Sequence, residues 1–536
     1  MGVEIFKGIP PSGFALKVPF LHIKSGFEAT SCAKLPLLGR NTFIPESQIT
    51  LMKPLDLEAP ETVKVKIGLE THVQLNTRSK MFCGCKNPVN LSEEPEPNTL
   101  TCETCLGMPG SKPRTNESAV SMSLKVAAAL NFSIAKETYF SRKTYFYPDM
   151  SKNFQISQYE IPLATKGWVD ISLDGHAKRI NLRRLHMEED PAKLVHIGGI
   201  GGKYVLVDYN RSGIPLIEIV TEPDFTSPEE ARLFLGKLAT ILEYLGVYDP
   251  NSKAVFKSDA NVSINGGKRV EIKNITGTKE IEMALKYEII RQSNVVRKGE
   301  VVSQSTRMWN PELQATQALR EKETEEDYGY IFEPDLTSIQ IEKFSLESIR
   351  KSLPELPDQK YQRFIHSYFI SDKLSESLTS ELDIANLFES VAKKIPPKLA
   401  ASWIAGYLKK TLNYNGIRFK DSKLREEWIV SLLQMFGKGL LTDRNAELVI
   451  RYMVSDKLPP DQVMKKHGIA KKESGSLREV EHTIKSVLEK NQKAVRDYKS
   501  GEEKALHYLV GLCMKATKGV ADANEVRKII RKLAGK

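Results

Sequence analysis

The stretch that decides the fold is residues 63–75, "VKVKIGLETHVQL", in which apolar and polar side chains alternate. This period of two predicts a β-strand, because successive side chains of a strand point to opposite faces of its sheet. Glu70 and His72 are two residues apart, so they lie on the same face of the predicted strand. One face of the strand can therefore pack against a core while the other presents a carboxylate beside an imidazole.

Further acidic residues occur in segments that are otherwise strongly apolar. A carboxylate at an inward strand position must be paired or bind a cation, because an isolated buried charge is too costly. Oxygen ligands with one imidazole suit Mg²⁺, which commonly bridges a protein and the phosphates of a substrate. Each acid alone is explained as well by a salt bridge or by solvation, but as a group, with Lys193, Arg211 and Lys273 near them in the sequence, they are consistent with a phosphoryl-transfer site. The acids are Glu188, Glu189, Asp190, Asp208, Glu218, Glu222, Asp259 and Glu271.

Glycine-rich phosphate-binding motifs of the common types are absent from the sequence. No Walker A sequence occurs, and the "GGIGG" of residues 198–202 lacks the spacing and the strand-to-helix context of a dinucleotide fingerprint. A nucleotide site in this chain would therefore not be of a common type.

Two pairs of cysteines follow the first strand, Cys83 with Cys85 and Cys102 with Cys105. Four thiolates satisfy tetrahedral zinc and leave no position for water, so the pattern predicts a structural zinc site rather than a hydrolytic one. The alternative is four unrelated buried or redox-active thiols. The other two cysteines, Cys32 and Cys513, are expected to be lone thiols, because a disulfide framework is not expected in so long a chain without a secretory signal.

The remaining pattern predicts an α+β fold followed by helices. Short strands and glycine-rich turns dominate residues 164–224, and "SDANVSI" and "RVEIKNI" predict two more strands. Beyond residue 336 the strand pattern ends and helical periodicity takes over. Helices are expected over residues 116–130, 227–246 and 278–298. The predicted parts are a loop-like extension over 1–61, a mixed-sheet domain with the zinc-stapled loop over 62–336, an all-helical domain over 337–468 and a small basic helical tail over 469–536.

The chain of 536 residues has a formal charge of +11, which is concentrated at its end. Residues 464–536 hold eighteen Lys or Arg against nine Asp or Glu. Such a tail suits a polyanion, most simply nucleic acid, although lysines on helices can also serve only solubility. The sequence contains no run of about 18 uncharged apolar residues, so it indicates no membrane-spanning helix. Residues 1–61 lack the pattern of a signal peptide, so we expect a cytoplasmic protein, or an organelle matrix if they form a transit segment.

Aromatic and cationic residues alternate over residues 139–159, "YFSRKTYFYPDMSKNFQISQY". Aromatic faces can stack on bases while cations hold phosphates, which suits the single-stranded end of an RNA. The alternative is a pair of strands with about half of these rings in the core.

Several long motifs in order resemble the B subunit of the aspartyl/glutamyl-tRNA amidotransferase family, from about residue 64 to the C-terminus. They are "IGLETHVQLNT", "FCGC…TCETCLGMPGSKP", "RKTYFYPD", "QISQYEIPL", "HMEEDPAKLVH", "LVDYNRSGIPLIEIVTEPD", "SDANVSI", "EIKN", "EEDYGYIFEPDL" and "LVGLCMKATKGVAD". Membership implies a cradle domain with a kinase and transamidase site, a helical domain and a tail that holds tRNA. It also implies a ligase that uses ATP and Mg²⁺ to phosphorylate the side-chain carboxylate of Glu or Asp misacylated on tRNA(Gln) or tRNA(Asn). Ammonia from a partner amidase would then displace phosphate, and a further small protein would complete a heterotrimer.

The resemblance also implies roles for particular residues. Glu70 and His72 stand where the family binds Mg²⁺, with Glu188 or Glu189 and Glu271 completing the ligands and Asp259 adding or supporting one. Lys273 joins these as a catalytic candidate, Arg211 and Lys193 as contacts to ATP, and Cys83, Cys85, Cys102 and Cys105 as zinc ligands. The candidates for tRNA contact are Arg142, Lys143, Tyr147, Lys515 and Lys518.

Two other classes of function remain open from the residues alone. A non-catalytic, zinc-containing tRNA-binding scaffold would bind RNA with a steep salt dependence and turn over no ATP. A zinc hydrolase is disfavoured, because the predicted zinc site uses all four thiols and leaves no position for water.

Overall fold

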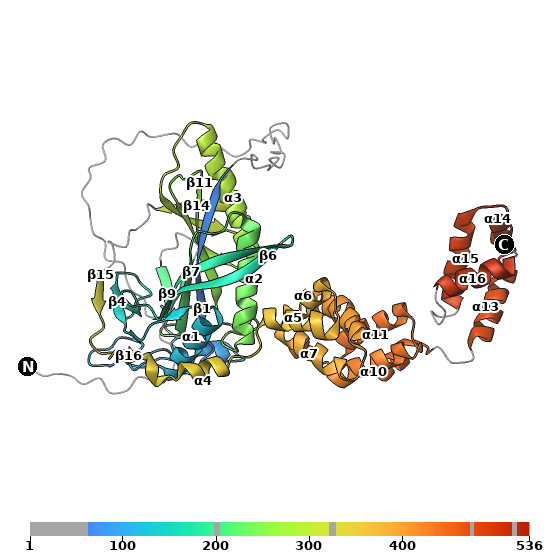
Figure 1. Cartoon of the computed structure of the whole chain (residues 1–536), viewed down its shortest axis with the longest axis horizontal. Coiled ribbons are helices and arrows are strands. Elements are labelled where there is room, and N and C mark those ends of the chain that lie inside the picture. The colour runs from blue at the N-terminus through green and yellow to red at the C-terminus, as the bar shows by residue number, and fades with distance from the viewer. Residues whose placement is uncertain (1–62, 198–203, 321–328, 472–475, 517–522, 535–536) are drawn as a thin grey trace, which may run out of the picture. The chain divides into compact units, whose positions relative to one another are not determined.

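The computed structural model describes residues 63–197, 204–320, 329–471, 476–516 and 523–534. The chain forms two compact units, the first ending at Pro354 and the second beginning at Glu355. Within the described residues, the first unit holds the strands and the second is helical (Figure 1). A mixed α+β fold with a helical C-terminal region is therefore confirmed. The finer boundaries at residues 61, 336 and 468 stay predictions.

A nine-stranded sheet forms the centre of the first unit, in the order β14-β13-β12-β11-β1-β10-β7-β6-β2. Neighbouring strands are antiparallel except for β12 and β13, which are parallel. The predicted strand around Glu70 is β1, and it lies in the middle of the sheet between β10 and β11. The strands are β1 (Val65–Gln74), β2 (Ser133–Ile134), β6 (Ala164–Leu173), β7 (His176–Glu189), β10 (Pro215–Thr221), β11 (Phe256–Ile264), β12 (Val270–Thr276), β13 (Ser305–Asn310) and β14 (Ala315–Arg320).

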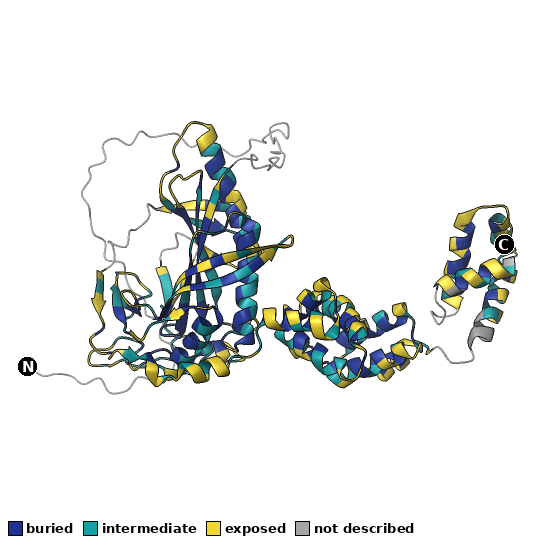
Figure 2. Cartoon of the chain, in the orientation of Figure 1, coloured by how far each residue is buried: buried dark blue, intermediate teal, exposed yellow. Residues whose placement is uncertain are grey.

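One face of this sheet carries the core of the unit. Ile67, Leu69 and Val73 of β1 are completely or almost completely buried. Helices α2 (Pro228–Tyr244) and α3 (Thr278–Arg297) pack on each other and on the sheet strands (Figures 1 and 2). Burying apolar area at roughly 25 cal/mol per Å² makes this layer the main stabilising contribution of the unit.

Local sequence signals set the ends of the helices. The side chain of Asn116 accepts hydrogen bonds from the backbone N–H groups at the start of α1 (Glu117–Ala129), and Ser227 caps α2 in the same way. Such caps satisfy N–H groups that have no partner within the helix. The three helices predicted before residue 300 are observed within about two residues of their expected ends.

The register of the sheet places the polar residues of four strands side by side on its other face. His186 of β7 lies opposite Glu218 of β10, Glu218 lies opposite His72 of β1, and His72 lies opposite Lys257 of β11. Two residues before His72 on β1, Glu70 lies opposite Asp259 of β11. This row of charged groups crosses the centre of the sheet, on the face opposite the buried residues of β1.

Three small sheets complete the strands of the first unit. One has the order β15-β4-β5, another pairs β8 with β9, and the third pairs β16 with β3. Their bounds are β3 (Glu137–Thr138), β4 (Ser141–Thr144), β5 (Phe154–Ser157), β8 (Lys193–Ile197), β9 (Tyr204–Asp208), β15 (Gly329–Phe332) and β16 (Ile339–Gln340). Strand β16 lies beyond residue 336, where we expected only helices. The sequence did not predict it, because a strand of two residues is too short to show a period of two.

The second unit is helical throughout the residues that the structure describes. Its final four helices have a core of their own, formed around Ile484, Leu509, Val526 and Ile530. Helix α4 (Leu346–Lys351) still belongs to the first unit. Among the described residues, the helices of the second unit are α5 (Pro357–Tyr368), α6 (Asp372–Thr379), α7 (Leu382–Ala392), α8 (Pro397–Ala401), η5 (Ser402–Leu408), α9 (Lys409–Tyr414), η6 (Phe419–Asp421), α10 (Glu426–Gly437), α11 (Asp443–Asp456), α12 (Pro460–His467), α13 (Ser476–Lys490), α14 (Gln492–Lys499), α15 (Glu503–Ala516) and α16 (Ala523–Ala534).

Candidate functional site

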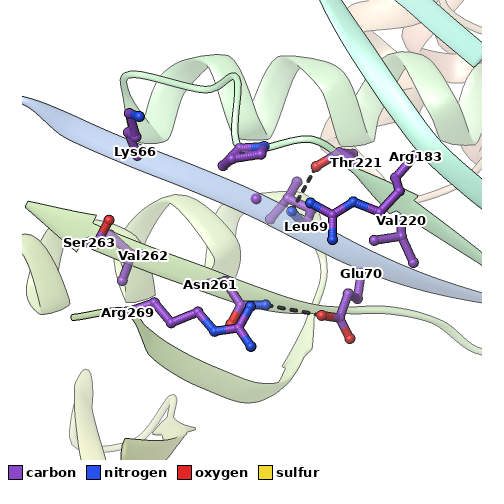
Figure 3. A pocket seen from close by; sticks show the side chains of 12 residues that line it. Lys66, Leu69, Glu70, Arg183, Val220, Thr221, Asn261, Val262, Ser263 and Arg269 are labelled. Carbon is purple, nitrogen blue, oxygen red and sulfur yellow. Dashed lines mark hydrogen bonds between the residues drawn. The ribbon is translucent and has the colours of Figure 1, made fainter. Parts of the chain in front are cut away.

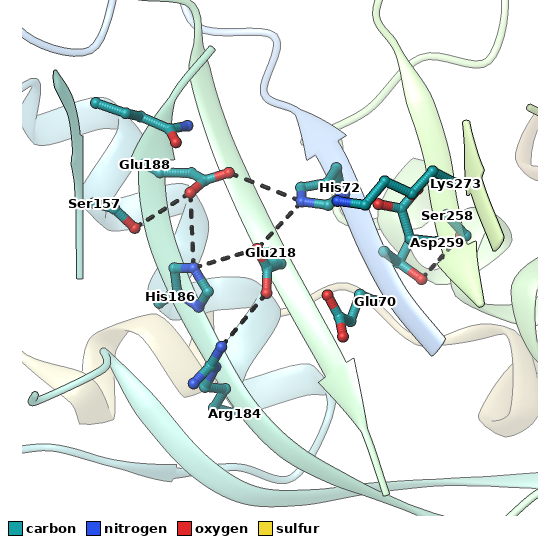
Figure 4. Close-up of polar contacts among 12 residues, drawn as sticks. Glu70, His72, Ser157, Arg184, His186, Glu188, Glu218, Ser258, Asp259 and Lys273 are labelled. Atoms are coloured by element: carbon teal, nitrogen blue, oxygen red, sulfur yellow. Dashed lines mark hydrogen bonds and ion pairs between the residues drawn. The ribbon is translucent and has the colours of Figure 1, made fainter. Parts of the chain in front are cut away.

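The polar face of the large sheet gathers an imidazole and two carboxylates from three strands. Ligand atoms of His72, Glu188 and Glu218 all lie within 4.8 Å of one another. His72 Nε2 is 3.2 Å from Glu218 Oε2 and 3.9 Å from Glu188 Oε1 (Figure 4). We call these three residues the carboxylate cluster. One nitrogen and carboxylate oxygens this close together are a donor set that fits a divalent cation such as Mg²⁺.

A second imidazole supports the carboxylates of this cluster from β7. His186 Nε2 lies 3.5 Å from Glu218 Oε2 and 3.8 Å from Glu188 Oε2, and its side chain is almost completely buried (Figure 4). Ser157 of β5 adds a hydroxyl 3.2 Å from Glu188 Oε2. Glu218 therefore lies between two imidazoles, and both carboxylates are held in place by neighbours as well as by their own strands.

Three further acids surround the carboxylate cluster on the same sheet face. Glu70 Oε1 accepts a hydrogen bond from Asn261 Nδ2 at 3.0 Å. Asp259 lies where the register of β11 against β12 shifts, and its Oδ1 accepts from the Asn274 backbone at 3.0 Å. A shift of this kind turns a side chain away from the regular pleat and is common beside active sites. Glu271 is buried on β12.

Two cations accompany these acids. Lys273 Nζ is 3.8 Å from Glu271 Oε1. Arg184 of β7 is 3.8 Å from Glu218 Oε1 (Figure 4). Its Nε is buried and has no hydrogen-bond partner among the described residues. These groups could contact an anionic ligand that reaches the cluster.

The charges of the cluster shift one another's pKa values strongly. Burial lowers the pKa of His72, but the hydrogen bond and charge of Glu218 and the charge of Glu188 outweigh it and raise the pKa to about 9. Burial raises the pKa of Glu218, yet the two imidazoles and Arg184 hold it well below its ordinary value. The pKa of Glu70 is raised, first by burial and then by Glu218 and other neighbouring carboxylates. Such perturbed groups in one place are typical of functional sites.

The structure separates two neighbouring glutamates that the sequence treated as equivalent. Glu188 belongs to the cluster, whereas Glu189 binds the Lys152 ammonium and accepts a hydrogen bond from the Ile156 backbone at 3.0 Å. Glu189 therefore takes no part in the cluster, because adjacent strand residues point to opposite faces. Glu218, noted only as a strand acid, is the third member instead.

Arg211 and Lys193, both predicted to contact ATP, have partners elsewhere. Arg211 donates to the carbonyls of Pro191 at 2.8 Å and Ala192 at 2.6 Å, which clamps the turn after β7. Lys193 is exposed on β8 and pairs with Glu94 at 3.3 Å. Neither belongs to the carboxylate cluster.

The residues predicted to contact tRNA lie in two regions of the sequence. Arg142, Lys143 and Tyr147 belong to the first unit, and Lys515 and Lys518 lie near the C-terminus. Arg142 makes two parallel hydrogen bonds of 2.8 Å to Glu333, which is fully buried, so this cation has a structural partner. Lys143 lies opposite Tyr330 across β4 and β15, and Tyr147 is 48% exposed. Lys515 is exposed near the end of α15, and Lys518 lies outside the described residues.

A pair of stacked tyrosines lies close to the carboxylate cluster. The rings of Tyr159 and Tyr330 are parallel within 14° at a centroid distance of 3.9 Å. Burial and the charge of Glu188 raise the pKa of Tyr330. The sequence analysis missed Tyr330, because β15 brings it to the site from more than a hundred residues away.

The four cysteines after β1 form a second compact group. Ligand atoms of Cys83, Cys85, Cys102 and Cys105 lie within 4.8 Å of one another, so together they could hold a metal ion. The first pair sits in a turn closed by the Lys80 N–H to Cys85 carbonyl hydrogen bond of 3.0 Å. The second pair sits in another turn, in which the Cys102 N–H donates to Cys105 Sγ at 3.1 Å. Four sulfurs and no open position fit a structural ion.

A buried lysine lies beside the cysteine group. Lys80 is completely buried, and its Nζ donates to the carbonyls of Leu100 at 2.8 Å and Tyr209 at 3.2 Å. The same nitrogen is 3.7 Å from Cys105 Sγ. A hydrogen bond from Cys83 and the charge of Lys80, opposed by burial, lower the pKa of Cys105 to about 5. A thiolate here is the form that a metal ion needs.

Two remaining expectations concern lone cysteines and membranes. Cys513 is buried in the core of the final four helices, and Cys32 lies outside the described residues. No helix within the described residues is long and apolar enough to cross a lipid bilayer.

Comparison with known proteins identifies the family to which most of this chain is similar. Residues 65–347 match the family described as the GatB/GatE catalytic domain, and residues 386–533 match the family described as the GatB domain. The B subunit of the aspartyl/glutamyl-tRNA(Asn/Gln) amidotransferase of Methanosarcina barkeri is 46% identical over 490 residues, covering 87% of this chain and 98% of its own. The protein of that name from Carboxydothermus hydrogenoformans is 41% identical over 474 residues, covering 87% of this chain and 97% of its own. The chain therefore belongs to the B-subunit family of the aspartyl/glutamyl-tRNA(Asn/Gln) amidotransferases.

Proposed function

We propose that this chain carries out the ATP-dependent transamidation of a misacylated tRNA, Glu-tRNA(Gln), Asp-tRNA(Asn) or both. The observation that carries the proposal is the carboxylate cluster of His72, Glu188 and Glu218, ringed by more carboxylates on one sheet face. Burying several carboxylates close together costs folding free energy, whereas a site that binds a divalent cation and phosphates needs such carboxylates. The relatives' shared name, which includes both tRNAs, supports the same activity.

The proposed reaction has two steps, a phosphoryl transfer and an acyl transfer to ammonia. An oxygen of the misacylated side-chain carboxylate attacks the γ-phosphorus of ATP, the bond to the β–γ bridging oxygen breaks, and ADP leaves. Ammonia then attacks the acyl carbon of the acyl phosphate, the C–O bond to phosphate breaks, and inorganic phosphate leaves with the amide formed. The nitrogen loses one proton in this step, which a neighbouring carboxylate can accept.

The cluster explains how this chemistry could proceed between two anions. A carboxylate and a triphosphate repel each other, and a bound Mg²⁺ would supply the opposing charge. His72, Glu188 and Glu218 would hold that ion. The sequence proposed Glu70 and Glu271 as ligands and Asp259 as a further ligand or a supporting group. In the present proposal these three acids would surround the ion and orient its ligands, and Glu189 would take no part.

Cations of the chain would bind the phosphates directly. Lys273 of β12 lies 3.8 Å from Glu271, and Arg184 of β7 lies 3.8 Å from Glu218. The Nε of Arg184 is buried and has no hydrogen-bond partner in the part of the chain that the structure describes, so it could donate to a phosphate oxygen. The exposed ring of Tyr147 and the ammonium of Lys143, which lies on β4, would contact the tRNA end.

The cysteine group would bind zinc and serve as a staple. Zinc with four thiolates has no open position, so it would take no part in the reaction. Its function would be to fix the loop that follows β1, and with it the end of the strand that carries Glu70 and His72.

Partners complete the proposal. An amidase would release ammonia from glutamine, and a further small protein would complete the heterotrimer, since the relatives' names describe one component of a larger enzyme. The basic final helices, with Lys515 exposed, would bind the tRNA backbone.

The decisive experiment is a transamidation assay with the chain assembled with its amidase partner. We expect ATP-dependent conversion of at least one misacylated tRNA by wild type, and no conversion by Glu188→Gln, with glutaminase activity of the partner retained. Comparing the two tRNAs assigns the substrate. tRNA binding without any ATP turnover by the wild-type complex would replace the proposal with a non-catalytic scaffold.

A further inference from the structure

Two pockets of the first unit lie on opposite faces of the large sheet. One of about 200 Å³ opens beside Glu70 on the polar face, so it belongs to the surroundings of the carboxylate cluster (Figure 3). The other, of about 500 Å³, lies between helix α3 and the hairpin of β13 and β14. We call it the α3 groove, and the residues that line it include Tyr287, Ile290, Arg291, Lys298 and Trp309. None of these residues has a role in the function proposed above.

The register of β12 against β13 separates the α3 groove from the carboxylate cluster. Glu271, on the face of the cluster, lies opposite Thr306. The next pair along the two strands is Ile272 with Arg307. Because adjacent strand residues point to opposite faces, Arg307 and Trp309 of β13 lie on the face that α3 covers. The sheet therefore stands between a ligand in the groove and the cluster.

Helix α3 carries two stripes of apolar side chains, and only one of them faces the core. Leu285 and Ile289 belong to the buried stripe. Met283, Tyr287 and Ile290 line the groove instead, at spacings of four and three residues that place them on one side of the helix. Tyr287 remains 37% exposed. The second stripe is thus available to an apolar ligand.

The floor of the groove is an aromatic corner. The rings of Tyr287 and Trp309 meet edge to face, with centroids 6.5 Å apart and an interplanar angle of 62°. The indole Nε1 of Trp309 donates a hydrogen bond to Glu280, which fixes the orientation of that ring. The volume of about 500 Å³ falls within the roughly 300–1,000 Å³ of small-molecule pockets. Corner and volume together suit a flat or branched apolar body.

The charged groups behind the groove leave a positive surplus. The fully buried carboxylate of Glu288 accepts hydrogen bonds of 2.6 to 3.1 Å from Arg291 and lies 3.4 Å from Arg307 Nε. No other carboxylate of the described residues pairs with either guanidinium, so two positive charges share one negative charge. Burial lowers the pKa of Arg307; the charge of Glu288 opposes this shift, and the charge of Arg291 adds to it. An anion bound beside Arg291 would balance the surplus.

The two lysines of the groove differ in their partners. Lys286 is paired with Glu229 at 2.7 Å and with Glu282 at 2.6 Å. Lys298, the C-cap residue of α3, forms no ion pair within the part of the chain that the structure describes. It follows Arg291 by seven residues, which is about two turns or roughly 10 Å along the helix. Arg291 and Lys298 are therefore the cations that can contact an anionic group in the groove.

We propose that the α3 groove binds a small organic anion, whose flat or branched apolar body lies against Tyr287 and Trp309 and whose anionic group lies between Arg291 and Lys298. A carboxylate or a phosphate fits this position, because both accept hydrogen bonds from a guanidinium. No member of the carboxylate cluster takes part, so the inference goes beyond the proposed function and does not rest on it.

The test measures the binding of anilinonaphthalene sulfonate, an apolar ring system with one anionic group, to the full chain by isothermal titration calorimetry. We expect a saturable site in wild type. Ile290→Glu, which puts a carboxylate into the groove, should weaken binding at that site by about tenfold or more. Val296→Glu is the matched control, because it makes a similar change at an exposed residue of α3 that does not line the groove. Its affinity should stay within about twofold of wild type.

A second pair of variants tests the anionic group. Lys298→Gln should weaken binding of the sulfonate severalfold and leave binding of neutral phenylnaphthylamine unchanged. Lys279→Gln is its control, because it removes an exposed cation from the first turn of α3, outside the groove. Competition by naphthoate and by naphthyl phosphate then shows which anionic group the site prefers. If Ile290→Glu lowers the melting temperature, Tyr287→Ala carries the test, because it removes half of the aromatic corner.

Three outcomes would overturn the inference. Wild-type affinity in both Ile290→Glu and Tyr287→Ala would show that the probe binds elsewhere. Equal affinity of wild type for the sulfonate and for the neutral probe would leave an apolar groove without an anion site. Loss of the site when the chain is assembled with its amidase partner would make the groove a protein interface. Transamidation by Ile290→Glu should equal that of wild type in each case, so failure of this inference is distinguishable from failure of the proposed function.

Discussion

The carboxylate cluster and the cysteine group are both compact enough to hold an ion, yet they are assembled in opposite ways. In each, the ligand atoms lie within 4.8 Å of one another. The cysteines all fall within residues 83–105 and come from two short turns. The members of the carboxylate cluster, His72, Glu188 and Glu218, come from three strands that are far apart in the sequence.

This difference separates stability from chemistry. A site built from two turns can form as soon as those turns close, so its ion mainly fixes a local loop. A site built across three strands exists only when the whole sheet has its correct register, so its groups can be placed with the precision that a reaction needs. We therefore expect damage to the two sites to appear in different measurements.

The largest expected effect comes from Glu218→Gln, which keeps the shape of the side chain and removes its charge. Loss of several kcal/mol of charge stabilisation at the reacting phosphate corresponds to a fall of about 1,000-fold or more in transamidation. Zinc content and partner glutaminase activity should be unchanged. An activity within about tenfold of wild type would show that the cluster is not the reaction centre, and the contrast between the two sites would disappear.

Cys105→Ser should have its main effect on stability. Loss of one thiolate removes the tetrahedral donor set, so we expect bound zinc to fall from about one equivalent to none, and the melting temperature to drop by about 5 °C or more. Cys513→Ser is the control, because that thiol lies in a different core and should leave the zinc content unchanged. Full zinc content in Cys105→Ser would contradict the assignment of the four ligands.

His186→Gln tests the support behind the carboxylate cluster. His186 contacts both Glu188 and Glu218, and removal of such a group typically weakens metal affinity by about 10–100-fold. Titration of the reaction with Mg²⁺ should therefore show a raised requirement and a maximal rate that largely recovers at high Mg²⁺. A variant with an unchanged Mg²⁺ requirement would limit the role of His186 to packing.

The smallest expected effect is the pH dependence of stability after removal of metal ions. The pKa of His72 is raised from 6.5 to about 9 in the fold, so its protonated form stabilises the folded state fully below pH 6.5. This stabilisation should be lost as the pH rises through about 9. In the chelated protein, the melting temperature should therefore fall by a few degrees more between about pH 6.5 and 9.5 in wild type than in His72→Gln. Equal falls in both proteins would show that His72 is not paired in the fold.

Local patterns allowed the sequence to predict one site almost completely and the other only in part. The spacing of the four cysteines indicated their grouping, and alternation placed Glu70 and His72 on one face. The stretch "RRLHMEE" also has a period of two, which could have linked Arg184, His186 and Glu188, but adjacency drew Glu189 into the ligand set instead.

The remaining part could not be read from the sequence because it depends on pairing between distant strands. Glu218 stood out as an acid in an apolar strand, yet nothing local shows that it lies opposite both His72 and His186. Tyr330 reaches the site only because β15 pairs with β4. The ends of the three helices before residue 300 were predicted more accurately than these contacts between strands, because helix caps depend on neighbouring residues in the sequence.

The central position of β1 has a consequence for how this protein can change. A single residue inserted between Val65 and Gln74 would reverse the inside and outside of every later position of the strand, exchanging His72 with its apolar neighbour. One such insertion would remove His72 from the carboxylate cluster and place charged side chains in the core. Lengthening of this chain is therefore expected to be tolerated only in its turns.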